Sequence, residues 1–157
     1  MEALSEIRRR FGAMVTASPD IDTMWESFQD SESCHNYGEV PAYFISSYVL
    51  GVRVGAGGVA GLGALIIEPR LGDLVWAAGN VVTEFGIVTV SWVVSPLYLF
   101  FTLSLPPEVL SCELRIPGQA SSLVLNGSPW PATSEGRWVV AQLGSGPANF
   151  SGSISLL

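Results

Sequence analysis

The sequence contains no lysine, one histidine and only two cysteines. All seven basic residues are arginines, set against fourteen acidic residues, and the net charge is −7. Three arginines form the run Arg8, Arg9 and Arg10, and the other four are scattered along the chain. A nucleic-acid surface needs a stripe of positive charge that displaces counterions from the phosphates. We therefore exclude nucleic acid as a partner.

The shortage of histidine and cysteine also limits metal binding. Cys34 and Cys112 lie far apart and fit no metal-ligand spacing, and a zinc site of histidines and cysteines is out of reach with His35 alone. One disulfide is conceivable, but two buried thiols are favoured, because free cysteine is among the most buried residue types. The sequence indicates no metal and no other cofactor.

No apolar leader opens the chain, because charged residues are spread through its first eleven positions. We therefore expect no secretory signal and, by default, a cytoplasmic protein. Residues 86–105 carry no charge and have the length of a membrane span. Ser95 and Pro96 interrupt this stretch, and its alternating β-branched and aromatic residues favour a β-hairpin. We expect no membrane partner, and an exposed apolar patch on this hairpin would mark an interface.

Apolar residues make up 48% of the chain and charged residues 13%, with a mean hydropathy of +0.42. This much apolar surface excludes intrinsic disorder. A length of 157 residues fits one ordinary domain or two very small ones.

Residues 1–54 have the pattern of helices. The first helix shows an apolar stripe at intervals of three and four residues, formed by Leu4, Ile7, Phe11 and Met14. A short second helix is expected over 23–28, with Asp22 or Thr23 as its cap. A third begins near Pro41, ends near Gly51, and places Phe44, Tyr48 and Val52 on one face. These few helices cannot bury their apolar stripes against one another alone, so a part that they would pack against is missing from this half.

A change of pattern follows the helical segment. Residues 55–63 are too rich in glycine for regular structure and indicate a linker, and no helix follows them that could bind a phosphate. From residue 64 the apolar period becomes two, in short runs separated by glycine and proline turns. The expected fold is α+β by content, with a helical segment (1–54) followed by an antiparallel β-sandwich (64–157).

The densest group of chemically useful side chains lies within residues 22–37. Its members combine carboxylates, an imidazole and flat aromatic rings: Asp22, Trp25, Glu26, Glu32, His35 and Tyr37. Such rings stack on a pyranose and such polar groups bind its hydroxyls. Acidic loops are common, however, and tryptophan or tyrosine beside a helix also serves as core, so this pattern alone leaves both interpretations open.

Several motifs in order resemble the C-terminal part of inverting α-L-rhamnosidases, over roughly residues 3–118. In that family a Thr-x-Trp-Glu signature ends a helix of an (α/α)6 barrel, and a Pro-x-x-Gly-Asp-Leu-x-Trp-Ala strand opens a β-sandwich. The counterparts here are Thr23-Met24-Trp25-Glu26, Cys34-His35-Asn36-Tyr37, Pro41-Ala42-Tyr43-Phe44, Leu50-Gly51 and Pro69 through Ala77. The resemblance implies that residues 1–54 are the end of such a barrel.

The resemblance also implies roles for individual residues. Glu26 corresponds to the general base that deprotonates water, while His35, Trp25, Tyr37 and Asp22 would contact the sugar. The general acid belongs to an earlier part of the barrel. We therefore expect a rhamnosidase-like fragment that hydrolyses terminal α-L-rhamnosyl linkages when complete and is inactive as this chain.

Two further interpretations remain open. The chain is also compatible with a non-catalytic β-sandwich module that binds carbohydrate or packs on another domain, and with a membrane-associated protein that uses residues 86–105. The expected partners are an α-L-rhamnoside, and either the missing barrel portion or a second copy held through apolar strands.

Overall fold

The computed structural model describes residues 2–17, 40–54, 64–144 and 148–157. The chain divides into two compact units, Met1–Ile45 and Ser46–Leu157, and each is described by itself. The expected second helix over 23–28 and the expected linker over 55–63 both lie outside the described residues.

Helix α1 (Glu2–Ala17) confirms the first expected helix. Leu4, Ile7 and Phe11 are half-buried along one stripe. On the exposed side Glu6 accepts hydrogen bonds from Arg9 Nη2 (2.7 Å) and Arg10 Nε (2.8 Å), at the three- and four-residue spacings that bring side chains together on a helix. These two arginines lower the pKa of Glu6 to about 2, chiefly through the hydrogen bond from Arg9.

The third expected helix begins near Pro41 and ends near Gly51 as predicted, but it does not reach Val52. It consists of α2 (Val40–Phe44), with Pro41 in its first turn, and continues as a π-helical turn, η2 (Ile45–Val49). Gly51 then adopts a φ of +79°, which a side chain would strain, and a Cβ there would meet the backbone of Glu68 at 2.3 Å. The expectation that Val52 continues the helix is wrong, because this reversal turns the chain into strand β1 (Val52–Val54).

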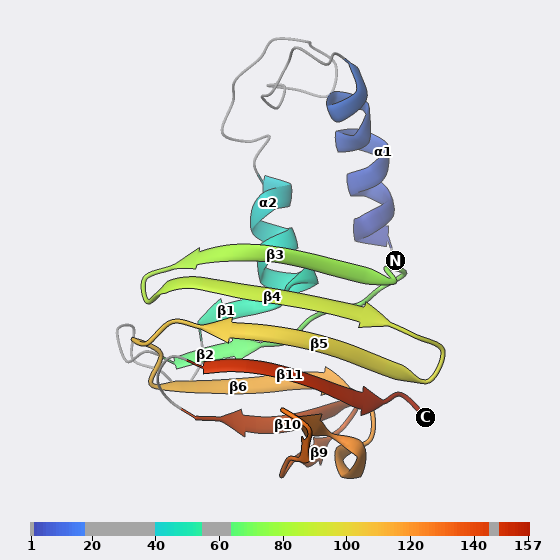
Figure 1. The fold of residues 1–157 in the computed structure, drawn as a ribbon. Coiled ribbons are helices and arrows are strands. Elements are labelled where there is room, and N and C mark those ends of the chain that lie inside the picture. The colour runs from blue at the N-terminus through green and yellow to red at the C-terminus, as the bar shows by residue number, and fades with distance from the viewer. Residues whose placement is uncertain (1, 18–39, 55–63, 145–147) are drawn as a thin grey trace. The chain divides into compact units, whose positions relative to one another are not determined.

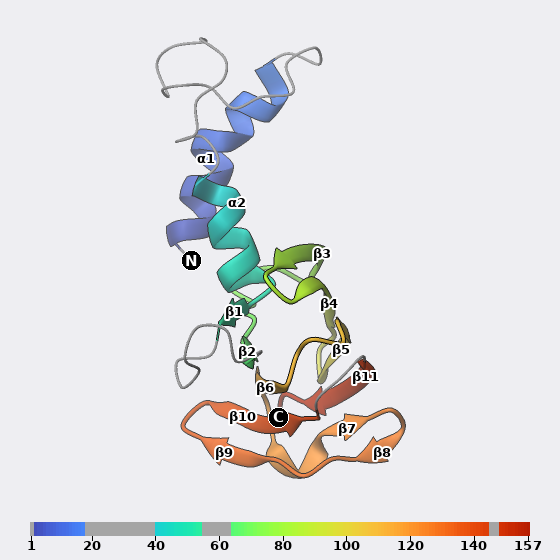
Figure 2. The same cartoon turned by 90° about the vertical axis from the view of Figure 1, so that its left-hand side faces the viewer.

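The unit Ser46–Leu157 contains two β-sheets. Sheet I has the strand order β1, β2 (Ala64–Ile67), β6 (Ser111–Pro117), β10 (Trp138–Leu143) and β9 (Thr133–Glu135). Sheet II has the order β3 (Trp76–Thr83), β4 (Gly86–Val94), β5 (Tyr98–Leu105), β11 (Ala148–Ser155), β7 (Val124–Leu125) and β8 (Ser128–Pro129). Figure 1 shows sheet II from its outer side, and Figure 2 shows the sheets edge-on as two layers.

The core lies between the two sheets. Alternate residues of each strand point inward, so that Leu65, Leu114 and Val139 of sheet I face Val90 and Leu103 of sheet II, all with 3% exposure or less. Trp92 is 1% exposed, and its indole N–H donates a hydrogen bond to the Val49 carbonyl oxygen (3.0 Å). This bond attaches the end of η2 to the sandwich.

The α+β fold with a β-sandwich is confirmed. Residues 86–105 form the β4–β5 hairpin rather than a membrane helix, and no helix in the described ranges is long and apolar enough to cross a bilayer. One pair, β2 with β6, is parallel, in contrast to the all-antiparallel arrangement expected. The short strands β1, β8 and β9 escaped prediction because runs of two or three residues show no periodicity.

Candidate functional sites

The five residues predicted to form a sugar site all lie outside the described residues. They are Asp22, Trp25, Glu26, His35 and Tyr37. Their roles therefore stay predictions. What the structure does describe is the sandwich that follows them, and its two outer faces differ sharply in the side chains they present.

Cys112 is a free thiol that lies in the core, with no exposed surface. Burial, with a smaller contribution from the neighbouring Glu113 carboxylate, raises the pKa of this thiol to about 12. A thiol that stays protonated is neither a nucleophile nor a metal ligand at neutral pH. Within the described ranges no three or more metal-ligating side chains gather into a site, and Cys34 lies outside those ranges.

The four arginines that are scattered in the sequence gather on the outer face of sheet I. Arg53 lies on β1 and Arg115 on β6, while Arg70 follows β2 and Arg137 precedes β10. The register explains how distant residues reach this face. Arg53 lies opposite Ile66 of β2, and Ile66 lies opposite Glu113 of β6, two residues before Arg115. Glu113 in turn lies opposite Gln142 of β10. Residues far apart in sequence thus share one face.

Glu68 is the buried centre of this face, with 6% exposure. Its Oε1 pairs with Arg53 Nη2 at 3.0 Å and with Arg70 Nη2. Two arginines on one carboxylate compensate the loss of its hydration, which an unpaired buried charge could not tolerate. The backbone N–H of Arg70 donates to the Tyr48 carbonyl (2.7 Å), which ties this cluster to the end of η2.

A second group on the same face surrounds Glu113. Its carboxylate accepts hydrogen bonds from Arg115 Nε and from the Gln142 amide (2.9 Å), and Arg115 Nη2 lies 3.8 Å from Glu135. The hydrogen bond to Glu113 raises the pKa of Arg115. Arg115 is thus paired with two carboxylates, so this group offers no free positive charge to a ligand.

Two guanidinium groups stack on one indole ring between these clusters. Arg70 and Arg137 lie over the Trp138 ring, with their Cζ atoms 4.8 and 4.9 Å from its centroid. Stacking of this kind stabilises a surface arrangement by about 0.5–1 kcal/mol. Because the same two arginines occupy the indole, we assign this face to structural support of the sandwich rather than to ligand binding.

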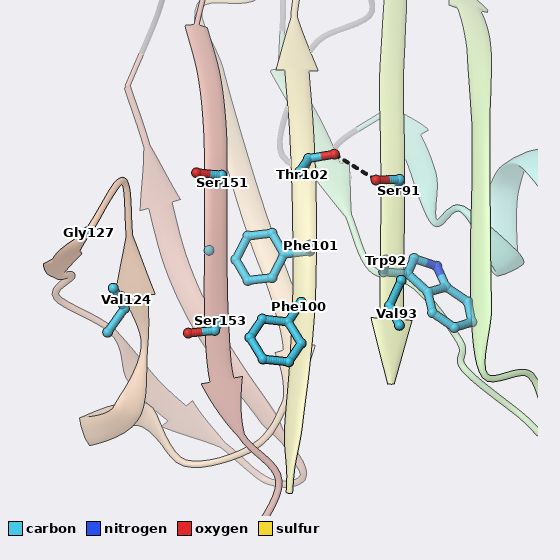
Figure 3. Close-up of a pocket in the computed structure, with 11 residues that line it drawn as sticks. Ser91, Trp92, Val93, Phe100, Phe101, Thr102, Val124, Gly127, Ser151 and Ser153 are labelled. Atoms are coloured by element: carbon cyan, nitrogen blue, oxygen red, sulfur yellow. Dashed lines mark hydrogen bonds between the residues drawn. The ribbon is translucent and has the colours of Figure 1, made fainter. Parts of the chain in front are cut away.

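The outer face of sheet II carries no charged residue in any of its six strands. A groove of about 410 Å³ lies on it, along β5, β11 and the β7–β8 hairpin. The polar lining consists of hydroxyl groups (Figure 3): Ser91, Thr102, Ser151 and Ser153. The sequence predicted an uncharged β4–β5 hairpin with an exposed apolar patch, but not the groove, which also needs β11 and the β7–β8 hairpin beside it.

Inside the groove, hydroxyl groups and an aromatic ring lie close together. Ser91 Oγ and Thr102 Oγ1 are 2.6 Å apart and hydrogen-bonded, and either can be the donor. Phe100 is 48% exposed beside them, and Ser153 lies opposite it in the β5–β11 register. Hydroxyl groups that both donate and accept, next to an exposed ring, suit a neutral polar ligand rather than an ion.

Two solved structures share this architecture. An α-L-rhamnosidase from Dictyoglumus thermophilum matches 83% of this chain with a TM-score of 0.61 and 25% sequence identity. The chain resembles part of an α-L-rhamnosidase. The Streptomyces avermitilis α-L-rhamnosidase, solved with L-rhamnose, matches 82% of the chain with a TM-score of 0.62 and 22% identity, which supports the fold alone. No family model and no curated protein matches the sequence.

The likeness to α-L-rhamnosidases confirms the resemblance predicted from the motifs and is consistent with a C-terminal β-sandwich portion of such an enzyme. The chain spans only 16% and 13% of the lengths of the two rhamnosidases. The match is also longer than the sandwich. It covers 83% of 157 residues, about 130 residues, whereas Ser46–Leu157 holds 112, so it includes residues that precede Ser46.

Proposed function

We propose that this chain is the end of the catalytic barrel and the following β-sandwich of an α-L-rhamnosidase-like glycoside hydrolase. In the complete assembly it would act in the hydrolysis of terminal α-L-rhamnosyl linkages with inversion. The observation that carries this proposal is the match to the Dictyoglumus thermophilum rhamnosidase, which extends from the sandwich into the residues before Ser46. The sequence motifs that resemble the family run from Thr23 to Ala77, across the end of the helical segment and the start of the sandwich.

In this proposal Glu26 is the general base. An inverting glycosidase uses one carboxylate to deprotonate a water on the face of the sugar opposite the leaving group. A second carboxyl group, about 6.5–9.5 Å from the first, protonates the glycosidic oxygen. His35, Trp25, Tyr37 and Asp22 would bind the rhamnosyl unit around that water.

The proposal assigns only one member of the catalytic pair to this chain. General acid or base assistance contributes about 10²–10⁴-fold to the rate, and the barrel walls that position the sugar contribute in addition. We therefore expect the purified chain to show no enzyme-like hydrolysis of 4-nitrophenyl α-L-rhamnoside. Rapid turnover by the chain alone, abolished by Glu26→Gln, would contradict this assignment.

A chimaera tests the assignment of Glu26 directly. The corresponding part of the Dictyoglumus thermophilum rhamnosidase is replaced by residues 3–157 of this chain, and hydrolysis of the aryl rhamnoside is measured. We expect activity that Glu26→Gln lowers by about 10²–10⁴-fold in kcat. Asp30→Asn is the matched control, since it removes a nearby carboxylate outside the motif and outside the candidate sugar-binding group. Equal losses in both variants, or none in either, would exclude Glu26 as the base.

A second candidate function is carbohydrate binding by the sandwich itself, and the neutral groove on sheet II favours it. Its volume of about 410 Å³ lies in the range of small-ligand sites, and its lining offers hydroxyl groups beside the exposed Phe100 ring. Calorimetry of the chain with L-rhamnose separates the two sites. Loss of binding in Phe100→Ala supports the groove, whereas loss in His35→Ala or Trp25→Ala supports the predicted barrel site. Leu110→Ala, at an exposed position outside the groove, serves as the control.

A further inference from the structure

Within the described residues, strand β3 (Trp76–Thr83) is an edge strand of sheet II. Among the described residues its strand partner is β4, with which it keeps an uninterrupted register over eight residue pairs, and it lies at the end of the strand order (Figure 1). The strand holds no charged residue and no proline. Proteins usually protect a long edge strand with charges, proline or a bulge, because its unpaired backbone groups invite another strand. β3 has none of these protections.

The direction of the free backbone groups follows from one hydrogen bond. The N–H of Val94 donates to the Val75 carbonyl (2.8 Å), so the polar groups of Val75 point toward β4. Backbone groups alternate in direction along a strand, and the odd-numbered residues of β3 therefore bond to β4. The even-numbered residues direct their N–H and C=O groups to the free edge. They are Trp76, Ala78, Asn80 and Val82.

We propose that β3 pairs antiparallel with β3 of a second copy of this chain. One register uses all the free groups, with Gly79 on the two-fold axis, Trp76 opposite Val82 of the second copy, and Ala78 opposite Asn80. Each of the four even-numbered residues then both donates and accepts across the edge, as in any antiparallel ladder. An isologous contact of this kind closes on itself as a dimer.

The side chains of β3 are self-complementary in the same register. Trp76 and Val82 are 63% and 82% exposed and lie at opposite ends of the strand, on the outer face. Antiparallel pairing places the indole of one copy beside the valine of the other, a cross-strand pair of the aromatic and β-branched type that stabilises sheets. On β4, Val93 and Ile87 are also exposed and lie opposite Trp76 and Val82, so they extend this apolar contact in each copy.

The distribution of charge also favours this edge over the rest of the surface as the place where two copies meet. Each chain carries a net charge of −7, so most contacts between copies are repulsive. The eight residues of β3 carry no charge, and the nearest acids in sequence, Asp73 and Glu84, lie beyond the paired residues. The apolar residues at the two ends of β3 match each other when one strand runs opposite to the other. We therefore infer that the strand that pairs with this edge is β3 of another copy.

Hydrogen exchange on the whole chain tests the proposal, because it distinguishes the amides of β3 that point toward β4 from those that point toward the edge. In a dilute sample the amides of Ala77, Gly79 and Val81 are expected to be protected, and those of Ala78 and Asn80 to exchange freely. In a concentrated sample that sedimentation shows to be dimeric, all five amides are protected. A chain that stays monomeric up to millimolar concentration overturns the proposal. So does a dimer in which Ala78 and Asn80 still exchange freely, or their protection in the dilute monomer.

Two variants test the register without disturbing the monomer. Ala78→Pro removes an edge N–H that β4 does not use, and proline is tolerated at such edge positions. Val82→Glu places a carboxylate opposite Trp76 of the second copy. Each is expected to raise the dimer dissociation constant at least tenfold. Leu110→Glu adds the same charge at another exposed apolar position and should leave the constant within about twofold. Equal weakening by Val82→Glu and Leu110→Glu would overturn the proposed contact.

Discussion

The two outer faces of the sandwich differ in almost every respect that decides how a surface behaves. All four arginines of the unit Ser46–Leu157 lie on the outer face of sheet I, where three of them pair with glutamates and Arg137 stacks on Trp138. The six strands of sheet II carry no charge, and their outward positions hold hydroxyl groups, amides and exposed apolar side chains. Charged groups on the face of sheet I pair with one another, whereas the face of sheet II presents uncharged polar and apolar groups.

This difference shows where binding can be expected. A face whose charges are already paired gains little from a ligand, because a new partner must displace an existing one. A face with a neutral groove and an unprotected edge strand has backbone and hydroxyl groups that are still available. Both proposed contacts of the sandwich, with a sugar and with a second copy, therefore fall on sheet II.

The largest expected effect is on the charged face. Glu68→Gln removes the carboxylate shared by Arg53 and Arg70 and leaves two guanidinium groups around a buried amide. Both arginines are partly exposed, so we expect a loss of about 2 kcal/mol in the free energy of unfolding rather than the larger cost of a fully buried pair. Urea unfolding at neutral pH measures it. Glu113→Gln, at a more exposed carboxylate, should cost less than about 1 kcal/mol. Equal costs would mean that burial does not distinguish the two groups.

An effect that appears only at high pH is expected from the core between the faces. The folded-state pKa of Cys112 is about 12, above the value for an exposed thiol. Folding therefore favours the protonated thiol, and this contribution is fully present at neutral pH and declines as the pH rises above about 9. We expect unfolding free energy to fall by about 1.4 kcal/mol per pH unit in that window, in a Cys34→Ser background. Adding Cys112→Ala should remove this slope. An unchanged slope would assign it to other groups.

The alternation of apolar residues predicted the longer strands of the sandwich, but it could not predict their partners. The gathering of the arginines depends on the pairing of β1 with β2, which places Val52 opposite Ile67, and on the parallel pairing of β2 with β6. Both pairings join segments that are separated in sequence. A single sequence therefore shows four isolated arginines, and the register alone brings them onto one face.

Val52 was wrongly assigned to the face of the third helix for a local reason. Phe44, Tyr48 and Val52 have helical spacing, and a valine suits a strand equally well, so periodicity could not separate the two. Gly51 was the decisive residue, because its positive φ reverses the chain. The predicted sugar site was identified through the family motifs, and none of its residues lies in the described ranges, so Glu26 remains a prediction that only the activity measurements address.

The smallest expected effect lies on the neutral face and sharpens the contrast between the two sheets. Thr102→Val breaks the exposed hydrogen bond to Ser91, but water can replace it and valine favours a strand. We expect the unfolding free energy to change by less than about 0.5 kcal/mol, with the same change at low and high salt. The cost of Glu113→Gln should instead shrink as salt screens its partly exposed ion pair with Arg115. A salt-dependent change in Thr102→Val would show that charge acts on sheet II after all, and the separation of the two faces would then be incomplete.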